Sequence, residues 1–240
     1  MAYDYIGLVN DVNRRLNEVE LTSANFASAK GFYGLIKDSV NAAIRDINQT
    51  HHEWPFNHVL AEETLTPGIT RYAFPSDAST IDFDTFRIKE DAMLGNKTQR
   101  LEVINYDDYL SNAVDQEYGD NSDKRKVPTG VFHAPSLEWG VTPPPDQAYE
   151  VAYEYYRVPV DLINPTDVPS IPERFRHVIN EGSMYHAYMF RSNEQAASIA
   201  KAKFEEGLKR MRIMLVNRYD YVRSTVVRQS SYTAFGDRVK

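Results

Sequence analysis

Two stretches near the start of the chain and two near its end carry apolar residues at steps of three and four. This spacing gathers apolar side chains on one face of a helix. It predicts a first helix over residues 4–19, with Asp4 as its N-cap, and a second over residues 26–49. Gly31 and Gly34 fall inside the second helix, where they suggest close approach of a neighbouring element. The two apolar stripes are Tyr5, Leu8, Val9, Val12 and Leu16, then Phe26, Ala29, Tyr33, Ile36, Val40, Ala43 and Ile47.

The helical pattern returns after Pro169, and Pro172 suits the first position of a third helix. The sequence Ser192-Asn193-Glu194 predicts a break, followed by a last helix from about Glu194 to Tyr219. A short link between two helices favours an antiparallel pair. The last stripe consists of Ala197, Ala200, Phe204, Leu208, Met211 and Leu215. Residues 221–240 carry no stripe, so we expect 222–228 to be extended or to become ordered on a partner.

Between these helical stretches the apolar period shortens to two, which is typical of strands. A short helix is predicted at Tyr106–Val114, and the charged stretch Glu117–Lys126 is predicted to be a mobile loop. The run 148–158 predicts the last strand, which ends at Pro159 and returns the chain to the helical part. The earlier predicted strands are 58–66, 69–74, 81–88 and a hairpin formed by 128–134 and 137–141.

The predicted fold class is therefore α+β. It is a helical bundle of two N-terminal and two C-terminal helices, with an inserted antiparallel β-module and an extended C-terminal tail. The predicted domains are a helical body of residues 1–55 and 159–219, a β-rich module of residues 56–158, and a tail of residues 220–240.

Charge divides the chain in the same way. The net charge is −7, but residues 56–158 hold 9 Lys and Arg against 18 Asp and Glu, whereas residues 217–240 hold 5 against 2. An acidic module does not grip nucleic acid, because phosphate contacts need a basic surface. It suits a passage through which DNA slides without adhering, while the basic tail suits an acidic partner surface.

Composition and motifs exclude several kinds of chemistry. The chain has no cysteine, which excludes disulfides and thiolate metal sites. No apolar run is long enough to span a bilayer, and no signal peptide is evident at the N-terminus. Gly-rich phosphate loops, GxSxG and HExxH are absent from the sequence. We therefore predict no enzyme, no catalytic residue, no cofactor and no membrane partner.

The remaining candidate groups have plainer interpretations. Glu173, His177 and Glu181 fall on one predicted helix face with spacing that suits a metal, although ion pairing with Arg174, Arg176 or water is the simpler interpretation. No metal site is predicted. The carboxylate pairs Glu62-Glu63, Asp82/Asp84 and Asp107-Asp108 are interpreted as solvated surface, and His186 as a packed or interface residue.

Five motifs follow one another in a recognisable order: YAFPSD at 72–77, PTGVF at 128–132, PPPD at 143–146, YEYYRVP at 153–159 and DVPSIP at 167–172. Together with the closing helical pair, this order resembles the head-to-tail adaptor proteins of tailed phages, particularly the tail tubular protein A type. The resemblance covers about residues 5–216.

The resemblance implies a structural virion protein in the neck or tail region, assembled in the host cytoplasm. Such a protein forms a homo-oligomeric ring, usually of twelve copies, which joins the portal protein to the tail nozzle or another tail protein. Double-stranded DNA passes through its lumen without sequence-specific binding. Within the basic tail we predict portal docking by Arg223, Val226, Val227, Arg228, Tyr232 and Phe235. The alternative is a carbohydrate- or cation-binding module, or an enzyme, that uses the acidic β-module.

Overall fold

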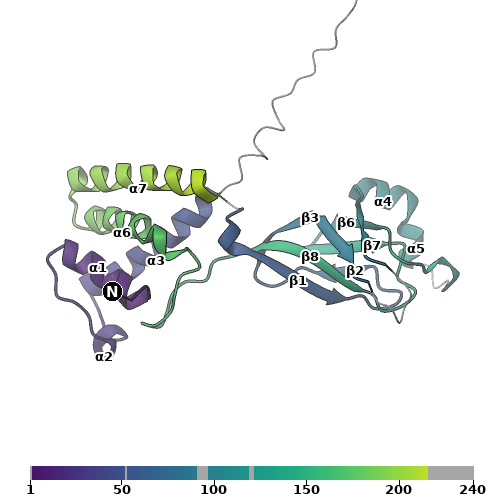
Figure 1. The fold of residues 1–240 in the computed structure, drawn as a ribbon, viewed down its shortest axis with the longest axis horizontal. Helices are drawn as coiled ribbons and strands as arrows, with labels where there is room; N and C mark the ends of the chain where they lie inside the picture. The colour runs from purple at the N-terminus through teal and green to yellow at the C-terminus, as the bar shows by residue number, and fades with distance from the viewer. Residues whose placement is uncertain (1, 52, 91–96, 119–121, 216–240) are drawn as a thin grey trace, which may run out of the picture.

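The computed structural model describes residues 2–51, 53–90, 97–118 and 122–215. Its long helices gather at one end of the molecule, and its two sheets lie at the other end together with the short helices of residues 106–118 (Figure 1). Two connecting segments join the two ends. The first segment passes through the 3-10 turn η1 (Pro55–Asn57), and the second follows the last strand. The predicted mixed α and β class is confirmed.

Long helices from both ends of the chain form the helical part. Asp4 caps the first of them as predicted, because its carboxylate accepts a hydrogen bond of 2.9 Å from the Gly7 backbone amide. The buried side chains form one continuous core that draws on both ends of the chain. The elements are α1 (Tyr5–Arg15), α2 (Ser23–Phe26), α3 (Phe32–Thr50), η3 (Glu173–Phe175), α6 (Arg176–Phe190) and α7 (Glu194–Leu215).

The single helix predicted over residues 26–49 is wrong at its start. The chain forms the short helix α2, leaves helical geometry, and begins α3 at Phe32. Gly31 lies between them at φ +62°, a left-handed conformation that glycine adopts without steric cost. Phe26 fits the apolar stripe because it is fully buried, with its ring edge-on to Tyr5 at 5.1 Å between centroids. Residues buried at helical spacing therefore lie on both sides of the interruption between α2 and α3.

Two other predictions about the helices need correction. Pro172 does not begin α6, because it precedes η3, and α6 begins four residues later at Arg176. The close helix packing occurs at Gly182 and Gly207 rather than at Gly31 and Gly34. A Cβ at Gly182 would lie 2.9 Å from the Ala43 methyl and 2.9 Å from the Phe204 ring. α3 and α7 therefore both approach α6 closely.

The strands form two four-stranded sheets, with orders β1-β8-β3-β4 and β2-β7-β6-β5. Their bounds are β1 (His58–Thr64), β2 (Arg71–Ala73), β3 (Ala78–Ile88), β4 (Gln99–Arg100), β5 (Glu102–Val103), β6 (Gly130–Ala134), β7 (Glu138–Thr142) and β8 (Glu150–Arg157). The remaining short elements are α4 (Tyr106–Asn112), α5 (Val114–Tyr118) and η2 (Ser122–Lys124).

The predicted last strand, β8, lies inside its sheet. It pairs antiparallel with β1, from His58↔Tyr156 to Thr64↔Glu150, and with β3 on its other side. The predicted hairpin is confirmed as β6 and β7, which pair antiparallel. The sheets are not antiparallel throughout, however, because β5 pairs parallel with β6 through Glu102↔Gly130 and Val103↔Val131.

Aromatic side chains fill the space between the two sheets. Phe86 stacks on Tyr153 at 4.5 Å between centroids, and Trp139 lies 4.9 Å from Phe86. All three side chains are fully buried, and such rings contribute large apolar areas to a core. This core is a separate cluster from the core of the helical part.

Candidate interaction surfaces

The predicted portal-docking residues Arg223, Val226, Val227, Arg228, Tyr232 and Phe235 lie outside the described residues, as does the predicted end of the last helix beyond Leu215. The structure describes α7 up to Leu215. Leu208, Lys209 and Arg212 on α7 line a cavity of about 210 Å³ together with His51 and Trp54. The last turns of α7 therefore lie beside the point where the chain leaves α3 for the sheets.

Several acidic side chains of the first sheet are paired with basic ones. Lys89 binds the carboxylates of Glu62 and Glu150 at 2.6 and 3.0 Å. The hydrogen bond from Lys89 lowers the pKa of Glu62, and the same two carboxylates raise the pKa of Lys89. Asp84 binds Arg100 at 2.7 Å. The negative charge of the sheet β1-β8-β3-β4 is therefore partly balanced by basic side chains on neighbouring strands.

Of the three candidate metal ligands, His177 and Glu181 lie on α6 and Glu173 lies in η3. The Glu181 carboxylate binds Arg15 of α1 at 2.8 Å, rather than the predicted Arg174 or Arg176. Arg176 binds Asp11 at 2.6 Å. His186 binds Asp46 at 2.8 Å, which joins α6 to α3. Within the described ranges no three His, Asp or Glu side chains are grouped so that they could hold a metal ion.

One residue assigned to the mobile loop is instead anchored. Glu117 lies in α5, and its carboxylate accepts hydrogen bonds of 2.9 Å from Arg71 Nη2 and 2.7 Å from the Tyr109 hydroxyl. The Arg71 guanidinium also lies over the Tyr106 ring. Burial and the Glu117 charge raise the pKa of Tyr109. Because of this network α4 and α5 are held against β2, and only residues 119–121 of the predicted loop are outside the described part.

The segment from residue 158 to 172, which we call the connector, has no regular structure but is firmly held. The Asp167 carboxylate accepts hydrogen bonds from the backbone amides of Ile163 and Asn164, at 2.8 and 2.7 Å. These bonds lower the pKa of Asp167. The side-chain amide of Asn41 on α3 bonds both to the amide and to the carbonyl of Leu162, at 3.1 and 3.0 Å.

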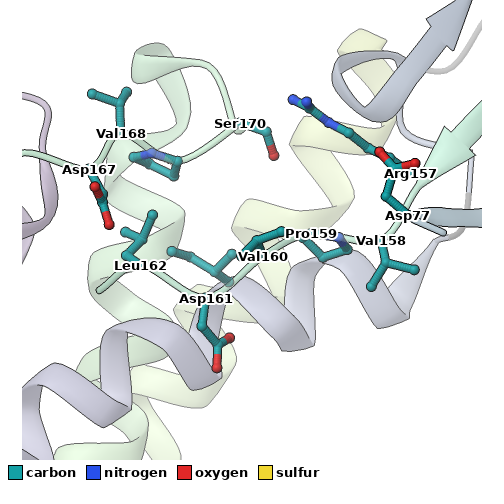
Figure 2. Close-up of a pocket in the computed structure, with 12 residues that line it drawn as sticks. Asp77, Arg157, Val158, Pro159, Val160, Asp161, Leu162, Asp167, Val168 and Ser170 are labelled. Carbon is teal, nitrogen blue, oxygen red and sulfur yellow. The ribbon is translucent and has the colours of Figure 1, made fainter. Parts of the chain in front are cut away.

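Although its backbone is fixed, the connector exposes several apolar side chains. Val160 is 78% exposed and Ile163 is 72% exposed, and Val158 and Val168 are also exposed. The two limbs of the connector lie on either side of a cavity of about 360 Å³, with Asp77 and Arg157 together at one end (Figure 2). Sequence reasoning missed this surface. Its only signal was a run of Val and Ile among Pro and Asp residues with neither helical nor strand periodicity.

An exposed apolar surface on a rigid backbone is typical of proteins that act by assembling with other proteins. None of the described helices is long and apolar enough to cross a membrane. The structure is therefore that of a two-part α+β protein with an exposed apolar surface suited to contact with another protein.

Comparison with protein families gives the class a more specific identity. The sequence model described as SU10 adaptor protein matches residues 3–229, and the chain belongs to this family. No curated protein matched the chain. The predicted resemblance to phage head-to-tail adaptors is thereby confirmed. Membership implies a structural phage protein of the virion neck that contacts other head or tail proteins, which is not a class of enzyme.

Proposed function

We propose that this chain is the subunit of a ring, usually of twelve copies, that joins the portal to the tail and surrounds the DNA passage. The observation that carries the proposal is the family match over residues 3–229. The separate cores of the helical part and of the sheets also support it, because they allow two different surfaces to be presented in two directions.

We assign a separate role to each of the domains expected from the sequence. A helical body of residues 1–55 and 159–219 builds the ring, and a β-module of residues 56–158 meets the tail nozzle or another tail protein. The basic residues of the tail, 220–240, dock on the portal. Support comes from the position of α7, whose last described turns, up to Leu215, lie beside the junction between helices and sheets.

The acidic β-module suits a neck protein in contact with moving DNA. Its carboxylates repel phosphates, and some of them also pair with Lys89 and Arg100, which reduces the positive charge available to the DNA backbone. DNA would thus pass the module without binding to it tightly or in a sequence-specific way.

Mass photometry of the purified protein, with and without its portal, tests the proposal. We expect a large complex with the portal, or large oligomers at high concentration. Monomers alone under both conditions would refute the ring. The alternative of a carbohydrate- or cation-binding module predicts instead that calcium or a glycan raises the melting temperature by several degrees, since a ligand that binds only the folded state stabilises it.

A further inference from the structure

Among the described residues of the helical part, exposed apolar side chains gather at several places, and two of them concern us here. The first is the connector, where the exposed side chains of Val160 and Val168 line the cavity described above. The second is the end of α7, where Ile213 is 62% exposed and Met214 is 65% exposed. An exposed pair in the last turn of a long helix beside basic residues is a surface suited to a partner rather than to solvent.

These two surfaces have opposite charge. From Gly207 to Leu215, α7 contains Lys209, Arg210 and Arg212 and no acidic residue, although Arg210 pairs with Glu206 of the preceding turn. From Val158 to Pro172, the connector contains Asp161 and Asp167 and no basic residue. Asp77 adds a third carboxylate to the cavity, against the single guanidinium of Arg157. The ion pair of Asp161 with Arg45, at 3.2 Å, leaves the Asp161 side chain half exposed.

The two surfaces also lie on opposite sides of the helical part. The connector is bonded to α1 through Tyr5 N–H and the Asp167 carbonyl, at 2.8 Å, and to α3 through Asn41. α7 packs on α6, which separates it from α1. In Figure 1, α7 follows the upper edge of the helical part while the connector loops to the lower edge. They are therefore unable to cover each other within one copy.

We propose that the end of α7, residues 207–215, packs on the connector of a second copy of this chain. Ile213 and Met214 would cover Val160 and Val168, and the basic side chains would face Asp77 and Asp161. Because the two surfaces differ and lie on opposite sides, the contact is head-to-tail, and such a contact builds a ring when the rotation between neighbours closes. The inference rests on the proposed ring function and names the surfaces that build it.

Cross-linking through introduced cysteines tests this contact, because the chain has no cysteine of its own. A chain carrying both Val160→Cys and Ile213→Cys is treated with a short bifunctional maleimide in the presence of the portal. We expect a ladder of covalent oligomers on a denaturing gel, since each copy has both halves of the contact. The matched control pairs Val160→Cys with Leu137→Cys, which is 71% exposed at the β6–β7 turn and should give no ladder.

The outcomes separate this inference from the proposed function. Rings seen by mass photometry without a ladder above the control would overturn the contact and leave the ring intact. Absence of any ring, with or without portal, would overturn both.

Charge reversal gives an independent test of the same contact. We expect the double variant Lys209→Glu/Arg212→Glu to need at least about tenfold more protein to assemble, because like charges then face the acidic connector. The control Lys201→Glu/Lys203→Glu makes the same charge change in the first half of α7 and should assemble as the unchanged protein does. Equal assembly by both variants would overturn the contact.

Discussion

Gly182 shows how one position sets the spacing of three helices. Its missing side chain lets α6 meet Ala43 of α3 and Phe204 of α7 at distances that no Cβ tolerates. We predict that Gly182→Ala destabilises the protein by about 0.5–2 kcal/mol, because overpacking outweighs the gain in helix propensity. Gly34→Ala is the control, since the added Cβ would lie 3.6 Å from its nearest neighbour, the Ala29 carbonyl oxygen, which is an ordinary contact distance. Chemical denaturation should find the control equal or more stable, and a stabilised Gly182→Ala would contradict the packing.

Phe204 tests the buried face of α7. Its side chain is 7% exposed and belongs to the core of the helical part. We predict that Phe204→Ala lowers the free energy of unfolding by about 2–5 kcal/mol through lost burial and a residual cavity. Ile199→Ala, on the exposed face of the same helix, should change it by no more than about 0.5 kcal/mol. Urea titrations of both variants make the comparison, and equal effects would mean that the two faces were assigned wrongly.

At the scale of elements, hydrophobic period predicted the long helices and the β6–β7 hairpin, because both are stabilised by local patterns of burial. The hydrophobic period did not reveal the interruption at Gly31. Phe26 lies before this interruption and is buried in the core, although it does not belong to α3. The hydrophobic period also did not predict the parallel pairing of β5 with β6. This pairing has only two residue pairs, and the partners lie far apart in the sequence. Short elements carry too few residues for a period to show.

One carboxylate, that of Asp167, is among the groups that fix the connector. The pKa of Asp167 is lowered in the folded protein, so its stabilising bonds are fully present above its ordinary pKa of about 4 and are lost as the pH falls through the lowered value. We predict that Asp167→Asn lowers the melting temperature at neutral pH, and that the difference narrows below about pH 4. Asp161→Asn, which removes only an exposed contact with Arg45, is the control. A difference that stays constant with pH would contradict this role.

Glu117 anchors the short helices α4 and α5 to β2. We predict that Glu117→Gln destabilises the fold by about 1–3 kcal/mol, because the uncharged amide weakens its bonds with Arg71 and Tyr109. Asp115→Asn, exposed on the same helix, should change stability by about 0.5 kcal/mol or less. Differential scanning calorimetry can compare the stability of the two variants. If Glu117→Gln is as stable as the unchanged protein, the network does not hold this segment.

At the scale of the whole molecule, ordered motifs in the sequence were enough to predict the adaptor class, which the family match confirms. The connector surface was not predicted, because exposed apolar residues in a loop look like buried ones until the fold shows what surrounds them. Residues such as Val160 and Val168 became recognisable only once Asn41 and Asp167 were seen to fix the backbone beneath them. The docking role of Arg223 to Phe235 stays a prediction.

Removal of the chain after Tyr219 tests that role. The described helical part and sheets contain their own cores, so the truncated protein should remain folded, with an unchanged melting temperature. We predict that it binds the portal weakly in a pull-down, because the basic tail is gone. Docking as strong as that of the full chain would show that another surface meets the portal.

The central claim is that copies of this chain form a ring between the portal and the tail. Electron microscopy of the purified protein mixed with its portal tests it most directly. The predicted result is a closed ring of copies beneath the portal, with an open lumen, helical parts in mutual contact and the β-modules facing away from the portal. Single copies scattered on the portal, or no bound copies at all, would contradict it.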